Sequence, residues 1–165
     1  MQFLSKETDN HILRPIGYGR IEKYVKRGSP VLSAAEQFTI QRDATRFESE
    51  LIYIPTPYEL NSRSYTMDMI PNIVRVPIIY YAAYPVLLHE IVRFIAFMLR
   101  NNYFVHSFDL LYDRTQQRFA IVDFSHCGFI QGTAVRFPHD DNTYSIDEAD
   151  MKYGIYIPNY WIYDG

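Results

Sequence analysis

Four charged residues lie at the ends of apolar segments, where they could serve phosphoryl transfer. Lys26 ends a strand-like segment, Glu36 follows ten residues later, and Asp123 ends a second apolar segment. Phosphoryl transfer needs a cation on the phosphates, a carboxylate that holds this cation, carboxylates for magnesium, and a base at the acceptor hydroxyl. The spacing predicts that Lys26 and Glu36 meet across the turn at residues 28–30. Asp123 would be presented at a sheet edge, where a carboxylate can bind a metal ion. Asp109, the fourth charged residue, begins the apolar segment before it.

Alternating and helical apolar patterns predict the elements that position these groups. Ser33 is a suitable helix cap, and prolines at 55 and 57 end the helix that follows. Pro85 suits the first position of a second helix. The expected elements are strand-like residues 11–27 with a break at 15–19, a helix over 34–51, a strand pair at 58–60 and 64–70, a linker over 71–85, a helix over 85–100, and a hairpin of strands 109–112 and 118–122.

Four segments in this order resemble the kinase-like phosphotransferases, above all the aminoglycoside phosphotransferase and choline-kinase-like branch. The segments are Val25-Lys26-Arg27-Gly28, Glu36, Ile54-Pro55-Thr56-Pro57 and Met67-Asp68-Met69-Ile70-Pro71. The resemblance covers about residues 20–128. It implies an α+β, protein-kinase-like two-lobed fold in miniature. Residues 11–71 would form a shortened β-rich front lobe with one helix, and residues 72–165 a truncated helical back lobe.

The resemblance also implies roles for individual residues. Lys26 would contact phosphates and Glu36 would be its ion-pair partner, while Asp123 and Asp109 would bind magnesium. The linker residues Met67, Asp68 and Met69 would contact adenine, so the implied cofactors are ATP and magnesium. Without a nucleotide site, Lys26 and Glu36 would form an ordinary surface ion pair worth about 0–1 kcal/mol, and Asp123 would be a turn residue.

The sequence departs from this family at two places. Only Ser107 and Phe108 separate His106 from Asp109, so the catalytic base is expected to be lost with its loop; in the other alignment Asp109 is itself the base. The Gly17-Tyr18-Gly19 segment lies so close to Lys26 that one early strand, and with it the amides that would hold phosphates, is expected to be missing.

These departures favour a pseudokinase-like binding or regulatory module. The alternative is a minimal ATP-dependent phosphotransferase that acts on a small-molecule or protein hydroxyl. A third interpretation is a structural α+β protein in which the four segments coincide by chance. A transition-metal cluster of His106, Asp109, Asp123, His126 and Cys127 has suitable residue types but lacks tight ligand spacing.

Composition limits the partners. The chain has 165 residues, a net charge of −3 and no basic block, which disfavours nucleic acid. Its 15 Tyr and 11 Phe suit a protein partner as well as a core. A single cysteine excludes an internal disulfide and favours an intracellular protein, cytoplasmic or nuclear. No apolar stretch reaches membrane-spanning length, so we expect a soluble chain with no membrane span.

Overall fold

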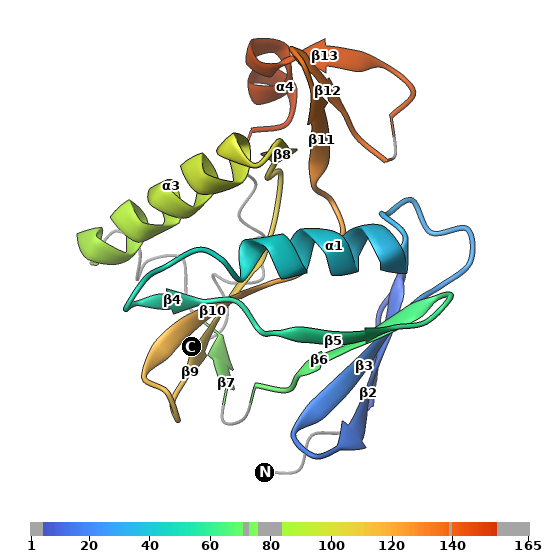
Figure 1. Cartoon of the computed structure of the whole chain (residues 1–165), viewed down its shortest axis with the longest axis vertical. Helices are drawn as coiled ribbons and strands as arrows, with labels where there is room; N and C mark the ends of the chain where they lie inside the picture. Colours follow the sequence, from blue (N-terminus) through green and yellow to red (C-terminus); the bar gives the residue numbers. More distant parts are fainter. Residues whose placement is uncertain (1–4, 71–72, 76–83, 139, 155–165) are drawn as a thin grey trace.

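The computed structural model describes residues 5–70, 73–75, 84–138 and 140–154. Within these residues the chain has an α+β fold of three helices and three sheets (Figure 1). None of the described helices is long and apolar enough to cross a membrane.

The first sheet is antiparallel and carries helix α1 (Ala34–Ala44) on one face (Figure 1). A turn at residues 17–19 joins its second and third strands, and all three turn residues have positive φ. Two of them are glycines, which adopt this backbone conformation without a steric penalty. The strand order is β1 (Lys6–Glu7), β2 (His11–Gly17), β3 (Arg20–Val25), β6 (Ser64–Asp68) and β5 (Pro57–Leu60).

Helix α1 begins where the sequence predicts and ends seven residues before the predicted end at Leu51. Ser33 and Glu36 form a capping box, in which each side chain accepts a hydrogen bond from the other residue's backbone N–H. Beyond Ala44 the chain turns, and Phe47 enters the core against Phe94 with ring centroids 5.4 Å apart. The residues that follow are extended because they pair with the second sheet.

The second sheet contains the predicted hairpin, β9 (Asp109–Asp113) and β10 (Arg118–Val122), which the structure confirms. Strand β4 (Ile52–Tyr53) runs parallel to β10, and β7 (Ile73–Arg75) lies antiparallel to β9. The predicted linker over 71–85 therefore includes a short strand, while residues 71–72 and 76–83 lie outside the described part of the chain.

Helix α3 (Pro85–Arg100) has the predicted bounds. It buries Leu87, Ile91, Phe94 and Met98, whereas Leu88 is half-exposed. These side chains share one apolar core with Ile40 of α1 and with Leu110 and Ile121 of the hairpin. A common core of this kind fixes the helices and the hairpin relative to one another.

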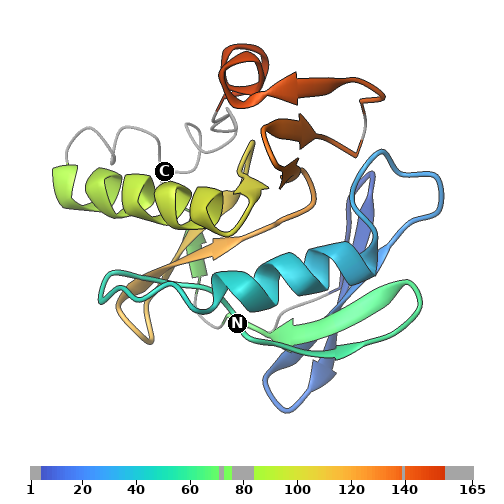
Figure 2. The same ribbon diagram turned by 45° about the horizontal axis from the view of Figure 1, so that its top comes forward.

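The third sheet was not predicted, because residues 125–154 have weak periodicity. Its order is β13 (Thr143–Ser145), β12 (Ala134–Arg136), β11 (Gly128–Gln131) and β8 (Tyr103–Phe104), and α4 (Ile146–Lys152) follows β13. Figure 2 shows this unit on the side of the molecule away from the first sheet. Asp140 accepts hydrogen bonds from the hydroxyls of Tyr144 and Tyr153 and from Lys152, and these bonds tie the acidic segment into a small folded unit.

Candidate functional site: a cleft between the first sheet and the hairpin

A cleft of about 550 Å³ lies between the first sheet and strands β9 and β10. Leu13, Ile21 and Met67 line it from the first sheet, and Leu111 and Val122 line it from the hairpin. Successive side chains of a strand point to opposite faces, so the hairpin buries Leu110 and Ile121 in the core and presents Leu111 and Val122 to the cleft. The result is a slot with two apolar walls.

Lys23 and Asp123 form an ion pair at the edge of this slot. Ile21, Lys23 and Val25 alternate with less buried residues along β3, so the lysine occupies an inward position of the strand. Its Nζ lies 3.5 Å from Asp123 Oδ1, and the two side chains are 6% and 35% exposed. A buried ammonium needs a partner of opposite charge, and Asp123, at the end of a strand of the second sheet, provides it.

Asp123 directly follows β10 and has a φ of +72°, a conformation that non-glycine residues rarely adopt. The backbone N–H and the hydroxyl of Ser125 both donate to Oδ1, the oxygen that also faces Lys23. Burial would raise the pKa of Asp123, but the Lys23 charge and the Ser125 hydrogen bonds outweigh burial and hold it well below its ordinary value. Asp123 is therefore ionised at neutral pH.

Lys23 is charged as well. Burial disfavours its ammonium form, yet Tyr65, Asp123 and Asp109 together raise its pKa above the ordinary value. The structure thus places a permanent ion pair, and not a proton-exchanging group, at the edge of the cleft.

Asp109 begins β9, lines the same cleft, and lies opposite Val122 in the strand register. Magnesium is commonly held by one or two carboxylates together with oxygens of the ligand, and Asp109 and Asp123 fit that donor set. Among the described residues there is no group of three or more His, Cys, Asp or Glu side chains that could hold a metal ion without such help.

The transition-metal cluster considered from the sequence is therefore not formed. Cys127 is buried in the main core, and burial raises its pKa to about 12, which keeps the thiol protonated. His106 lies 3.2 Å, through Nδ1, from the carbonyl oxygen of Gly154, and its ring packs against Tyr153. Asp109, Asp123 and His126 do line the cleft.

The predicted contact between Lys26 and Glu36 is wrong. Lys26 directly follows β3, and its Nζ lies 2.6 Å from Oε1 of Glu7. The Glu36 carboxylate accepts hydrogen bonds from the backbone N–H and the hydroxyl of Ser33 in the capping box. Neither residue lines the cleft. Lys26 lies three residues after Lys23, and side chains separated by an odd number of residues along a strand point to opposite faces. Lys26 therefore faces away from the cleft that Lys23 lines.

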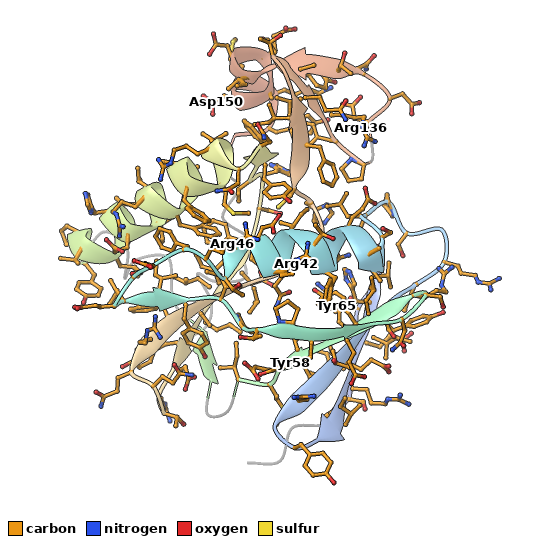
Figure 3. The ribbon with its side chains drawn as sticks, in the orientation of Figure 1. Arg42, Arg46, Tyr58, Tyr65, Arg136 and Asp150 are labelled. Carbon is orange, nitrogen blue, oxygen red and sulfur yellow. The ribbon has the colours of Figure 1, made fainter. Side chains whose placement is uncertain are left out.

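Two of the buried positions of α1 are glutamines. Gln37 and Gln41 are fully buried, the former 3.2 Å from Nε2 of His11 and the latter accepting a 2.9 Å hydrogen bond from the Tyr65 hydroxyl. Figure 3 shows Tyr65 between the first sheet and α1. Burial and the Lys23 charge lower the pKa of His11 to about 4. The sequence signal was present, since both glutamines lie on the apolar stripe with Ile40 and Ala44.

The predicted linker residues Met67, Asp68 and Met69 all line the cleft. Their backbone N–H groups are used within the protein at two positions: Asp68 donates to the Thr56 carbonyl at 3.0 Å and Met69 to that of Gly19 at 2.8 Å. The Asp68 carboxylate accepts a 2.6 Å hydrogen bond from the hydroxyl of Tyr58. This segment is thus a fixed wall that offers mainly methionine side chains.

Comparison of the chain with protein-family models, with curated proteins and with solved structures gave no match.

Proposed function

We propose that this chain is a pseudokinase-like ligand-binding or regulatory module, with a miniature two-lobed arrangement that resembles the aminoglycoside phosphotransferases. The first sheet and α1 correspond to the front lobe, and the hairpin with α3 corresponds to the back lobe. The observation that carries the proposal is the Lys23–Asp123 ion pair, because it places a strand lysine and a strand-terminal aspartate at the junction of these two parts.

The cleft suits a flat, apolar-faced ligand such as a nucleobase. Ile21 and Met67 on one side and Leu111 and Val122 on the other would contact the two faces of a ring. Ligand sites of this kind are mostly apolar, with a few polar groups that fix orientation. Here Lys23, Asp109 and Asp123 are those polar groups.

The proposal expects no catalysis because of the short connection between His106 and Asp109. Phe108 is buried in the core, and Ser107 is the only other residue of this short connection. No carboxylate is therefore available there to take the proton of an acceptor hydroxyl. Loss of a general base typically costs about 10²–10⁴-fold in rate, and poorer positioning of phosphates would reduce the rate further.

The alternative is a minimal ATP-dependent phosphotransferase acting on a small-molecule or protein hydroxyl. Its support is that Asp109, Asp123 and Lys23 share one cleft, which brings two magnesium ligands and a cation together. In that case Asp109 would be either the catalytic base or a metal ligand, because this position is the candidate for both roles.

A regulatory role would involve a protein partner inside the cell. Fully exposed Tyr18, at the tip of the β2–β3 turn, is the kind of aromatic side chain that protein interfaces use.

One experiment with two readouts tests the proposal. The protein is titrated by calorimetry with nucleosides and nucleotides, with and without magnesium, and separately incubated with γ-labelled ATP and candidate acceptors. We expect binding of a base-containing ligand and no label transfer. Asp123→Ala should weaken binding, whereas Asp147→Ala, on exposed α4, should not. If the unaltered protein transfers label and Asp123→Ala does not, the phosphotransferase alternative replaces the proposal. If no compound binds, both functions are rejected.

A further inference from the structure

We infer that the cleft selects a nucleoside-like ligand without phosphates, uncharged or positively charged, over the corresponding nucleotides. This inference rests on the proposed function and specifies its ligand. Two independent features carry it: the charge of the cleft wall and the absence of groups that hold phosphates.

The wall has an excess of negative charge. Asp9, Asp68, Asp109 and Asp123 line the cleft, while Lys6 and Lys23 are its cationic residues. Among the described lining residues, with both histidines counted as neutral, negative charges exceed positive charges by two. A phosphate in this cleft would therefore be repelled, whereas an amine would be attracted.

The buried cation is already neutralised. Lys23 is paired with Asp123, and Asp109 acts on it too, raising its pKa. A phosphate could reach the Lys23 ammonium only by competing with a carboxylate that the fold holds in place through Ser125. The outer cation, Lys6, is exposed on a two-residue strand, where attraction to an anion is weakened by solvent.

No described part of the cleft wall provides a phosphate cradle. Its residues include neither a glycine nor an arginine, the residues whose close backbone approach or forked donors usually hold phosphates. The Gly17–Gly19 turn, which joins β2 to β3, is not part of the cleft wall. The carbonyl of Gly19 accepts a hydrogen bond from the backbone N–H of Met69. The N-terminus of α1 is occupied by its own capping box and cannot serve as an anion site.

The turn between β1 and β2 contributes an acidic residue to the cleft. Residues 8–10 connect β1 to β2 and line the cleft with Asp9 among them. The turn is anchored, since Thr8 N–H donates to the His11 carbonyl at 2.9 Å and Lys26 N–H to that of Asn10, also at 2.9 Å. The acidic residue is therefore presented by a fixed turn, which adds to the repulsion of a phosphate.

Calorimetry with adenosine, guanosine, cytidine and uridine and with their 5′-mono- and triphosphates, without magnesium, tests this inference. We expect at least one nucleoside to bind, its monophosphate to bind about tenfold more weakly, and the triphosphate to bind more weakly still. The difference in affinity between a nucleoside and its phosphates should become smaller at high salt, because salt screens exposed charges. A monophosphate that binds as tightly as its nucleoside would overturn the inference and leave the proposed function intact. If no compound binds, both fail.

Two charge variants sharpen the test. Asp9→Asn changes one charge in an exposed turn, and Asp9→Asn/Asp109→Asn changes two; the double variant should narrow the nucleoside-to-monophosphate ratio by about tenfold. Glu59→Gln, on β5 and away from the cleft wall, changes the net charge by one, as Asp9→Asn does, and should leave the ratio of the two affinities unchanged. A thermal unfolding midpoint equal to that of the unaltered protein reports an intact fold in each variant. An unchanged ratio in the double variant would contradict the inference.

Discussion

Lys23 Nζ and Asp123 Oδ1 lie 3.5 Å apart although the residues are 100 positions apart in the chain. The lysine belongs to the antiparallel first sheet, and the aspartate follows the last strand of the hairpin. The contact therefore joins two sheets that share no backbone pairing. Both walls of the cleft are positioned by the elements that carry this pair.

Replacement of Lys23 by methionine should destabilise the protein, whereas the same change at Lys26 should not. Lys23→Met leaves Asp123 without its cation in a largely buried place, and we expect a loss of about 1–3 kcal/mol in the free energy of unfolding. Lys26 pairs with Glu7, whose side chain is mostly exposed, so Lys26→Met should cost less than about 0.5 kcal/mol.

Urea denaturation at pH 7 measures both values. Equal losses for the two variants would contradict a stabilising role that belongs to Lys23 and not to Lys26.

The stability of the protein should fall on mild acidification because His11 is buried in its neutral form. Its pKa is about 4 in the folded chain against 6.5 for the ordinary side chain. Between these values the unfolded chain binds a proton that the folded chain excludes, so stability is lost as the pH falls from about 7 to 4. The full shift corresponds to up to about 3 kcal/mol.

His11→Gln removes the titrating group and keeps a side chain that can accept a hydrogen bond from Gln37. Free energies of unfolding at a series of pH values should decline less steeply for this variant than for the unaltered protein above pH 4. Parallel curves would contradict a buried neutral histidine. Below about pH 4 the depressed pKa of Asp123 adds a further loss in both proteins.

Ser33 and Glu36 should act on helix stability and not on ligand binding. Ser33→Ala removes the oxygen that accepts from the Glu36 N–H and should cost about 1 kcal/mol. Glu36→Gln retains a capping-box side chain and should cost less than about 0.5 kcal/mol. Calorimetric titration of Glu36→Gln with the ligand found for the unaltered protein should give the same affinity. A tenfold loss would restore Glu36 as a site residue.

Local patterns predicted the elements that have strong periodicity and the pairing of the two hairpin strands, and they did not predict pairing between distant segments. The helix at 85–100 and the hairpin strands follow from apolar spacing and turn residues alone. The inward lysine was recognisable from the alternation of Ile21, Lys23 and Val25, but similarity to a family motif directed attention to Lys26. The alternation of side chains along the strand was the stronger physical signal, because a shift of one residue places a side chain on the opposite face of the sheet.

The rest of the site depends on contacts between distant segments. Asp9 reaches the cleft only because β1 pairs with β2, and β1 is two residues long. The third sheet forms from short strands. One of its pairs, β11 with β8, joins segments that lie more than twenty residues apart in the sequence. Its stability comes from side chains such as Phe104 and Phe137, which pack at 5.6 Å between ring centroids, and not from local propensity.

The location of the bound ligand tests the central claim most directly. Amide chemical shifts of the isotope-labelled protein are recorded during titration with the nucleoside that binds best in calorimetry. We predict that the largest changes fall on the cleft residues, above all at positions 21, 23, 67–69, 111 and 122–123. Changes confined to the distant surface around Arg46 and Arg93, or no saturable change at all, would contradict a ligand cleft built on Lys23 and Asp123.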